Sequence, residues 1–260
     1  MTVYVDRNGG FGNQLFQLAA AIGLDEHGDG RLLLRPGEQP LLWHIGRSLM
    51  TPEITADDHR AAANVPPEQR YRQPERLVSD AFQPPPNFSP RPRRIAGYFQ
   101  HPDWYTAALP RIVDAILADA PPSVVAAPNR RAVVHVRGAD YGPLGWMLPH
   151  SYYVAARGVA PFERAITITG DDDRGSIVAG VLTAAGTDVA APTLSNPVND
   201  FWTLVAAPTL VMSNSTFAWW AAHAGDELYR RAGLRRTVVF PKQWILGEGA
   251  VLCAPGWVAV

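Results

Sequence analysis

Residues 209–220 read Thr-Leu-Val-Met-Ser-Asn-Ser-Thr-Phe-Ala-Trp-Trp, and this stretch decides the fold. Its apolar start, Thr209–Ser213, predicts a buried strand, and the small polar residues that follow lead directly into a helical pattern near Phe217. The same alternation continues through the second half of the chain, with further strands predicted at Ala132–Arg137, Ala165–Thr169 and Thr237–Phe240 and further helices near Tyr152, Ser176 and Phe201. Strands and helices in this order predict an α/β fold with a parallel, doubly wound sheet.

The first half of the chain begins with a similar unit. A strand is predicted at Thr2–Val5, a glycine-rich turn at Asn8–Gly12 and a helix over Asn13–Leu24, with Asn13 as its N-cap. The helix is apolar almost all round, so we expect it to be buried. Its polar residues Asn13 and Gln17 lie one turn apart on one face, where they either satisfy neighbouring backbone groups or face a cleft.

Between these two regions the pattern is weaker. Arg35–Arg94 is rich in proline, arginine and glutamine and predicts loops and short helices. Pro102–Ala118 predicts a helix, and Pro121–Pro128 predicts a linker because its prolines interrupt helices and strands. We therefore expect two lobes, residues 1–128 and 129–260.

The bulk composition excludes several classes of partner. The chain has 260 residues, 47% of them apolar, and a net charge of −1, which gives no general attraction for nucleic acid or an anionic membrane. Its single cysteine, Cys253, allows neither an intrachain disulfide nor a cysteine-based metal site. No apolar run is long enough to span a bilayer, and no secretory signal pattern is present, so a soluble, cytoplasmic protein without stable membrane insertion is expected.

Polar residues follow the predicted strands, where parallel sheets bind their ligands. Alternation along the strand at 132–137 places His135 and Arg137 on one face, so that Arg137 emerges at the carboxyl end, where its guanidinium can grip two phosphate oxygens. The alternative is an ion pair between Arg137 and Asp140, with His135 as a core residue.

The Ser213–Thr216 segment precedes a helix, where free N–H groups and hydroxyls favour a phosphate. Alternatively, Ser213, Asn214 and Ser215 only cap that helix. We expect Trp219 and Trp220 to be core or interface residues.

A group of acids, Asp171-Asp172-Asp173, follows the strand at 165–169. Such carboxylates accept hydrogen bonds from a ribose or a base edge, although acids at a helix start also complement its dipole, as we expect for Asp173. No histidine or further acid lies at ligand spacing, so no metal site is predicted.

Together these segments resemble the alpha-1,2-fucosyltransferase family. Similar motifs occur in the same order in this chain, at Gly9–Gln17, Gly97–Gln100, Arg137–Tyr141, Leu148–Tyr153, Asp171–Asp172 and Ser213–Ala221. The similarity extends from Gly9 to Trp244 and so covers nearly the whole chain. It departs from the family pattern at Gly138, where the family has a second arginine.

The resemblance implies a two-lobed GT-B fold, an acceptor side in the first lobe, donor binding in the second, and metal-independent, inverting transfer of fucose from GDP-fucose to a glycan. No cofactor beyond this co-substrate is implied. The implied catalytic residues are Arg137 and His135 at the diphosphate, Asn13 near the acceptor or glycosidic oxygen, and Asp140. The implied donor-binding residues are Gly10, Phe11, Gly12, Asp171, Asp172, Asn214, Ser215, Thr216 and Phe217.

Other functions stay open. The missing second arginine at position 138 is also compatible with a different nucleotide sugar or with a binding module that has lost catalysis, and Lys242 is a candidate substitute cation. The glycine turn alone would also suit a generic nucleotide-binding protein. The acceptor's proton has three candidate bases, Asp6, Asp140 and His135, and water or phosphate could also take it.

Overall fold

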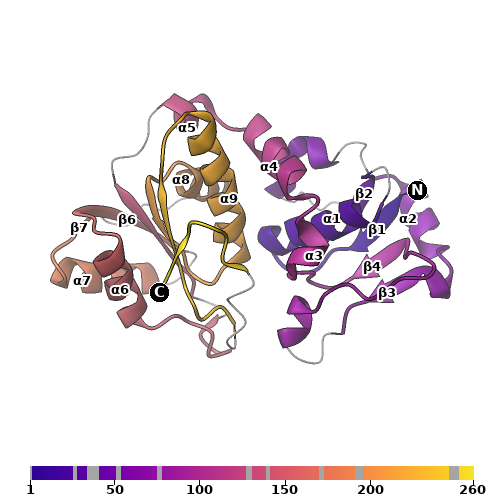
Figure 1. The fold of residues 1–260 in the computed structure, drawn as a ribbon, viewed down its shortest axis with the longest axis horizontal. Coiled ribbons are helices and arrows are strands. Elements are labelled where there is room, and N and C mark those ends of the chain that lie inside the picture. Colours follow the sequence, from indigo (N-terminus) through magenta and orange to yellow (C-terminus); the bar gives the residue numbers. More distant parts are fainter. Residues whose placement is uncertain are drawn as a thin grey trace. The chain divides into compact units, whose positions relative to one another are not determined.

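The computed structural model divides the chain into two compact units, residues 1–119 and 120–260 (Figure 1). It describes residues 2–25, 28–33, 41–50, 54–74, 78–126, 131–138, 141–169, 173–190, 196–245 and 252–260. The sequence suggested a boundary after residue 128, whereas the second unit already includes the short helix α5 (Pro122–Ala126), in the stretch expected to be a linker.

The first unit is built on a four-stranded parallel sheet in the order β2-β1-β4-β3. Its strands are β1 (Val3–Asp6), β2 (Gly30–Leu33), β3 (Arg70–Arg72) and β4 (Arg94–Ala96). The strands β3 and β4 lie at the borders of or within the stretch predicted as loops and short helices. Three residues are too few to display the alternation by which a strand is recognised in a sequence.

Helix α1 (Phe11–Leu24) contacts β1 and β2 and is largely buried, as expected. It begins two residues earlier than predicted. Gly10 is the N-cap and makes no side-chain cap bond, so the prediction that Asn13 caps the helix is wrong. Asn13 lies in the first helical turn instead, where its side chain is available for tertiary contacts.

The remaining helices of the first unit are short. Among the described residues, 3₁₀ helices lie at Leu41–Trp43, Arg47–Met50, Pro67–Gln69 and Val78–Phe82, and the α-helices are α2 (Ala56–Ala63), α3 (Pro102–Tyr105) and α4 (Leu109–Ala118). The single helix predicted over Pro102–Ala118 is therefore interrupted at residues 106–108.

The second unit contains a six-stranded parallel sheet in the order β10-β9-β8-β5-β6-β7. Its strands are β5 (Ala132–Val136), β6 (Arg164–Thr169), β7 (Asp188–Ala190), β8 (Thr209–Val211), β9 (Thr237–Phe240) and β10 (Val258–Ala259). The helices that alternate with them are α6 (His150–Val159), α7 (Arg174–Ala184), α8 (Pro197–Val205) and α9 (Thr216–Arg231). The predicted doubly wound α/β fold is confirmed, and β7 and β10 are additions to it.

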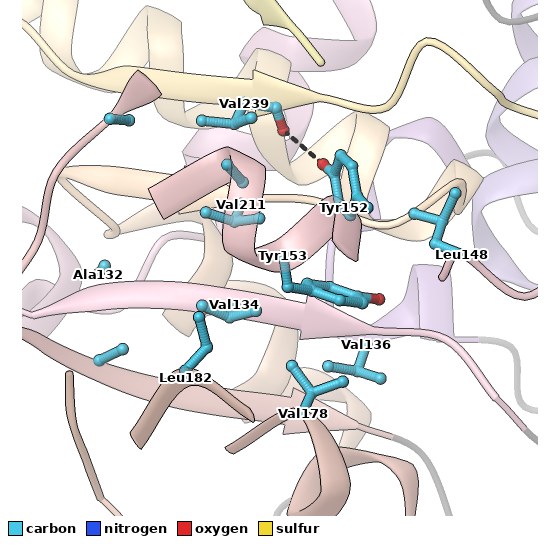
Figure 2. Close-up of a cluster of buried hydrophobic side chains, with 13 residues drawn as sticks. Ala132, Val134, Val136, Leu148, Tyr152, Tyr153, Val178, Leu182, Val211 and Val239 are labelled. Carbon is cyan, nitrogen blue, oxygen red and sulfur yellow. Dashed lines mark hydrogen bonds between the residues drawn. The ribbon is translucent and has the colours of Figure 1, made fainter. Parts of the chain in front are cut away.

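One face of this sheet packs against α6 and α7. Figure 2 shows the cluster, in which Val134 and Val136 of β5 meet Tyr153 of α6 and Leu182 of α7. The Tyr152 hydroxyl donates to the Met212 carbonyl at 2.6 Å and approaches that of Val239 at 3.3 Å. Because Val134 and Val136 lie on this buried apolar face, the residues of β5 that alternate with them face the opposite side of the sheet.

In each sheet, the order in which the chain adds strands reverses at one point. In the first unit the chain leaves β1 toward β2 and returns to place β4 on the other side of β1; in the second it leaves β5 toward β6 and β7 and returns to place β8 beside β5. At such a switch point, connections run to opposite sides of the sheet, which opens a crevice for ligands outside the carboxyl ends of the two central strands. We call these places the first and second switch points.

Candidate functional site

The second switch point brings together two of the predicted segments. His135 is on β5, and Ser213 follows β8; the Nδ1 atom of His135 and the Oγ atom of Ser213 are 2.7 Å apart. The His135 ring also lies 6.2 Å from the Phe217 ring at the start of α9. His135 thus faces away from Val134 and Val136, which confirms the predicted alternation.

His135 is 6% exposed. Burial, and secondarily the positive charge of Arg137, lowers the pKa of His135 to about 3. The imidazole is therefore neutral at pH 7 and can donate or accept a hydrogen bond, but it adds no positive charge to the site. A base with this pKa also takes up a proton poorly at neutral pH.

Arg137 follows the last residue of β5 and is partly exposed. Its guanidinium carbon lies 4.9 Å from the centre of the Tyr141 ring, so that the aromatic face supports the cation. The next residue, Gly138, is buried, and its carbonyl accepts a hydrogen bond from the Tyr141 N–H at 2.9 Å. Arg137 itself lies directly after the carboxyl end of β5.

Helix α9 begins at the same place. Its N-cap, Ser215, makes no side-chain cap bond, and Thr216 and Phe217 in the first turn are partly exposed. The hydroxyl of Ser213 is engaged by His135. Ser215 therefore occupies the N-cap position without a side-chain bond, and the side chains of Ser213 and Asn214 bind elsewhere. Trp219 and Trp220 are buried core residues, as predicted.

Asn214 ties two loops to the switch point. Its Nδ2 atom donates to the carbonyls of Trp146 at 2.8 Å and Trp244 at 2.5 Å. Its Oδ1 atom is buried and has no hydrogen-bond partner in the part of the chain that the structure describes. An amide fixed through both N–H groups presents this oxygen in a defined direction.

The first switch point joins the turn after β1 to the segment after β4. Gln17, fully buried on α1, donates to the carbonyls of Asn8 and Gly97, each at 2.9 Å, and accepts from the Asn8 N–H at 3.1 Å. Of the two interpretations of the polar helix face, Gln17 fulfils the first, because it satisfies backbone groups.

The segment after β4 has an unusual backbone. Phe99 is fully buried and has a φ angle of +55°, which costs a residue with a side chain on the order of 1–2 kcal/mol. The Gln73 Oε1 atom accepts from the N–H groups of Tyr98 at 2.9 Å and Phe99 at 3.0 Å and holds this conformation. Strained backbone of this kind is typical of functional sites.

Asn13 meets this segment. Its Oδ1 atom accepts a hydrogen bond from Gln100 Nε2 at 3.2 Å. Gly9, with a φ angle of +72°, leaves space for the other end of the amide, since a Cβ atom there would lie 2.5 Å from Asn13 Nδ2. Gly10 ends the turn, whereas Phe11 and Gly12 are buried residues at the start of α1. Gly10 is open: beyond its own surroundings in the chain, a Cβ atom there would meet no described atom within 4 Å.

Three predicted site residues, Asp140, Asp171 and Asp172, lie outside the described residues. Of the candidate bases, Asp6 accepts two hydrogen bonds from Arg94, at 2.9 and 3.1 Å. Among the described residues, no group of three or more histidine, cysteine or acidic side chains could hold a metal ion. Within the same residues, no helix has both the length and the hydropathy that crossing a bilayer requires.

Sequence reasoning missed two contributors. Gln73 lies in the region predicted as loop and carries no local signal, because its partners are 25 and 26 residues away. Gln100 belongs to a quoted motif, but nothing in the sequence indicated that it would reach Asn13.

No protein-family model matches the sequence, and no curated protein matches it. Solved structures do. The crystal structure of POFUT1 in complex with GDP matches with a TM-score of 0.52 and 11% identity, over 91% of this chain and 97% of that one. The E. coli heptosyltransferase WaaC with ADP has a TM-score of 0.49, 13% identity and coverages of 100% and 92%. The crystal structure of the fucosyltransferase NodZ from Bradyrhizobium matches with a TM-score of 0.45 and 17% identity, over 85% of this chain and 92% of that one.

At these identities the likeness concerns the fold alone, and POFUT1 carries it. Both units of the chain contribute to the match, which covers almost the full length of each protein. The chain has the GT-B glycosyltransferase fold, with a parallel α/β sheet in each unit.

Proposed function

We propose that this protein is a glycosyltransferase that moves L-fucose from GDP-fucose to a sugar hydroxyl, with inversion. The observation that carries the proposal is the second switch point, where Arg137 emerges beside the start of α9 and its hydroxyl residues. Positive charge and hydrogen-bond donors converge there. This is the chemistry that a nucleoside diphosphate requires.

In this proposal Arg137 holds the diphosphate through its guanidinium fork, and Ser215, Thr216 and Phe217 cradle it at the helix start. Asp171 or Asp172 meets the guanosine. From the motif resemblance alone, Gly10, Phe11 and Gly12 of the first unit are also assigned to the donor. His135 is neutral, so we assign to it the orientation of Ser213 rather than a charge.

The proposed reaction is a single displacement. The acceptor hydroxyl oxygen forms a bond to the anomeric carbon of fucose, the bond from that carbon to the β-phosphate oxygen breaks, and the hydroxyl's proton passes to water or to the phosphate of the departing GDP. Negative charge grows on the departing GDP, and donors aimed in advance at such charge are usually the largest catalytic contribution. Arg137 and the α9 N-terminus supply these donors, so the proposed transfer is metal-independent.

The choice of fucose and of the α-1,2 linkage rests on the resemblance of the motifs to alpha-1,2-fucosyltransferases. It is supported by the fold similarity to POFUT1, whose structure contains GDP. A second candidate is a transferase for another nucleotide sugar, or a binding module with weakened catalysis. Gly138, in place of the family's second arginine, favours this candidate because the site then has one cation fewer.

A donor panel tests the proposal. Purified protein is incubated with GDP-fucose and with GDP-, UDP- and ADP-linked sugars of other kinds, and thermal shift, hydrolysis and transfer to a glycan library are followed, the last by mass spectrometry. We expect stabilisation and a mass increase of one deoxyhexose with GDP-fucose alone. Turnover of another donor instead supports the second candidate, and binding without turnover supports a binding module.

The same assay tests the metal-free mechanism. Transfer should persist in excess EDTA, because the proposed charge stabilisation comes from Arg137 and backbone N–H groups. Complete loss in EDTA, followed by recovery with magnesium or manganese, would contradict it.

A further inference from the structure

We propose that Gln100 is a positioning residue that fixes the side-chain amide of Asn13 for the transfer step. The inference rests on the proposed function, in which Asn13 approaches the acceptor or the glycosidic oxygen. It identifies what holds Asn13 in place and which of its two amide atoms is left for the substrates.

Gln100 is itself held in place. Its side chain is 5% exposed, and its backbone N–H donates to the Ala81 carbonyl at 2.8 Å. The residue before it, Phe99, is locked in its φ of +55° by Gln73 and packs against Trp104 with ring centres 4.8 Å apart. A rigid, strained segment thus delivers the Gln100 amide to one place.

The side-chain amides of Gln100 and Asn13 are in direct contact. Gln100 Nε2 donates to Asn13 Oδ1 at 3.2 Å across 87 residues of sequence. The Gln100 Oε1 atom is buried and has no hydrogen-bond partner among the described residues. The cost of leaving an acceptor buried in this way is about 1–3 kcal/mol, so the arrangement favours orientation over stability.

The Nδ2 atom of Asn13 is left for a further contact. Because Oδ1 is occupied by Gln100, the amide plane is set and Nδ2 points into the space that Gly9 leaves open, where a Cβ atom would approach it to 2.5 Å. Gly9 is itself tethered, since its carbonyl accepts from Gln14 Nε2 at 3.1 Å. In the residues that the structure describes, no acceptor for Asn13 Nδ2 is present, so this N–H₂ group is available to a substrate oxygen.

A double-mutant cycle tests the inference. Gln100→Met keeps the unbranched shape and removes the donor, and it should lower kcat roughly fivefold to tenfold, as expected for one neutral hydrogen bond. GDP affinity, measured by calorimetry, should stay within about twofold, because the diphosphate is held in the second unit. In an Asn13→Ala background, Gln100→Met should have no further effect on kcat, because Gln100 acts only through Asn13.

Two variants sharpen the cycle. Gln100→Glu offers only acceptor oxygens, so Asn13 must turn its Nδ2 atom toward the new carboxylate, and kcat should fall at least as far as in Gln100→Met. Gln14→Met is the matched control: Gln14 is also a buried glutamine with an unpartnered Oε1 atom, but its Nε2 binds backbone. Any loss of kcat in Gln14→Met that arises from the backbone of the glycine turn, and not from Asn13, should persist in the Asn13→Ala background.

A second readout does not depend on activity. The side-chain ¹⁵N–¹H₂ resonance of Asn13, assigned by its loss in Asn13→Ala, should be sharp and dispersed in the wild type. In Gln100→Met it should move toward random-coil shifts, and melting curves of all variants show whether the unit remains folded.

An unchanged Asn13 resonance in Gln100→Met overturns the proposal, as does an equal loss of kcat with and without Asn13. If the wild type transfers no sugar at all, the proposed function fails, whereas the resonance still decides whether Gln100 positions Asn13.

Discussion

The two switch points both lie between the central strands of a parallel sheet, but their chemistry differs. Around the first, a group of neutral amides, Asn13, Gln14, Gln17, Gln73 and Gln100, binds backbone groups or, for Gln100 and Asn13, one another. At the second, the cation Arg137 stands beside a neutral histidine and the hydroxyl-rich start of α9. A diphosphate that gains negative charge requires the second set, whereas hydroxyl groups of a sugar are matched by the first.

The contrast also shows how each loop is held. In the first unit, amides brace a strained backbone segment at Phe99, and the glycine turn leaves room for Asn13. In the second, Asn214 binds two carbonyls of separate loops, and the Tyr141 ring lies against the Arg137 guanidinium. Charge placement tolerates small errors because Coulomb forces fall slowly with distance, but a neutral hydrogen bond needs its geometry. We therefore expect the two sites to respond differently to substitution.

The largest effect is expected at Arg137. Arg137→Ala should lower turnover by about 10²–10³, the usual cost of removing one preorganised donor to a developing oxyanion. Arg137→Lys should recover little, because a point charge lacks the bidentate fork. Steady-state transfer assays, with circular dichroism as the folding control, measure both. A variant with near wild-type rates would remove the contrast with the amide site.

The buried His135 should make the second unit sensitive to acid. Its pKa is about 3 in the folded state and near 6.5 when unfolded, so the stability it lends is complete above pH 6.5 and declines as the pH falls toward 3. Between pH 7 and pH 5 this amounts to about 2 kcal/mol. Urea unfolding followed by tryptophan fluorescence suits the test, because all tryptophans except Trp43 and Trp104 lie in the second unit.

His135→Asn cannot be protonated in this range and serves as the comparison. It should be less stable than the wild type at pH 7 but lose less of its stability at pH 5. Equal pH dependence in the two proteins would mean that other groups determine the acid response.

Gly138 tests whether the second site lacks a cation or has been reshaped. Gly138 is buried, and adding a side chain at a buried position costs about 1–3 kcal/mol. Gly138→Arg should therefore weaken GDP binding by roughly tenfold, and Gly138→Ala should do so less. Calorimetric titration with GDP measures both. Tighter binding and faster transfer in the arginine variant, with alanine neutral, would show that the site only lacks a charge.

The smallest effects are expected from alanine substitutions of two adjacent glycines at the first switch point. Gly9→Ala forces a side chain into φ +72° and against Asn13, so the free energy of unfolding should drop by about 1–2 kcal/mol. Gly10→Ala enters open space from an ordinary φ of −77° and should stay within about 0.5 kcal/mol of the wild type. Denaturant melts give both values.

Transfer assays on the same pair add a functional reading. If the donor approaches the Gly10 backbone as proposed, Gly10→Ala should transfer fucose more slowly despite its normal stability. Full activity in Gly10→Ala would remove Gly10 from the donor site.

The sequence by itself determined the repeating β/α pattern of the second unit. The strand Thr237–Phe240 has the predicted bounds, β5, β6 and β8 differ by a residue or two at their ends, and Trp219 and Trp220 are core residues. These features are local, because the period of apolar residues records which face of an element is buried. The order of the motifs also placed the candidate site at strand ends, where the structure has His135, Arg137 and Ser213.

Only the tertiary structure decided which residues meet. His135 and Ser213 are 78 residues apart, Gln100 and Asn13 are 87 apart, and Gln73 reaches the segment after β4. These contacts follow from the strand order, which brings β4 beside β1 and β8 beside β5, and a single sequence carries no periodic signal for it. The same holds for Asn13: local preference favoured a helix cap, but the helix starts at Phe11 and the amide turns to Gln100, because a distant hydrogen bond and a glycine cap together replaced the local one.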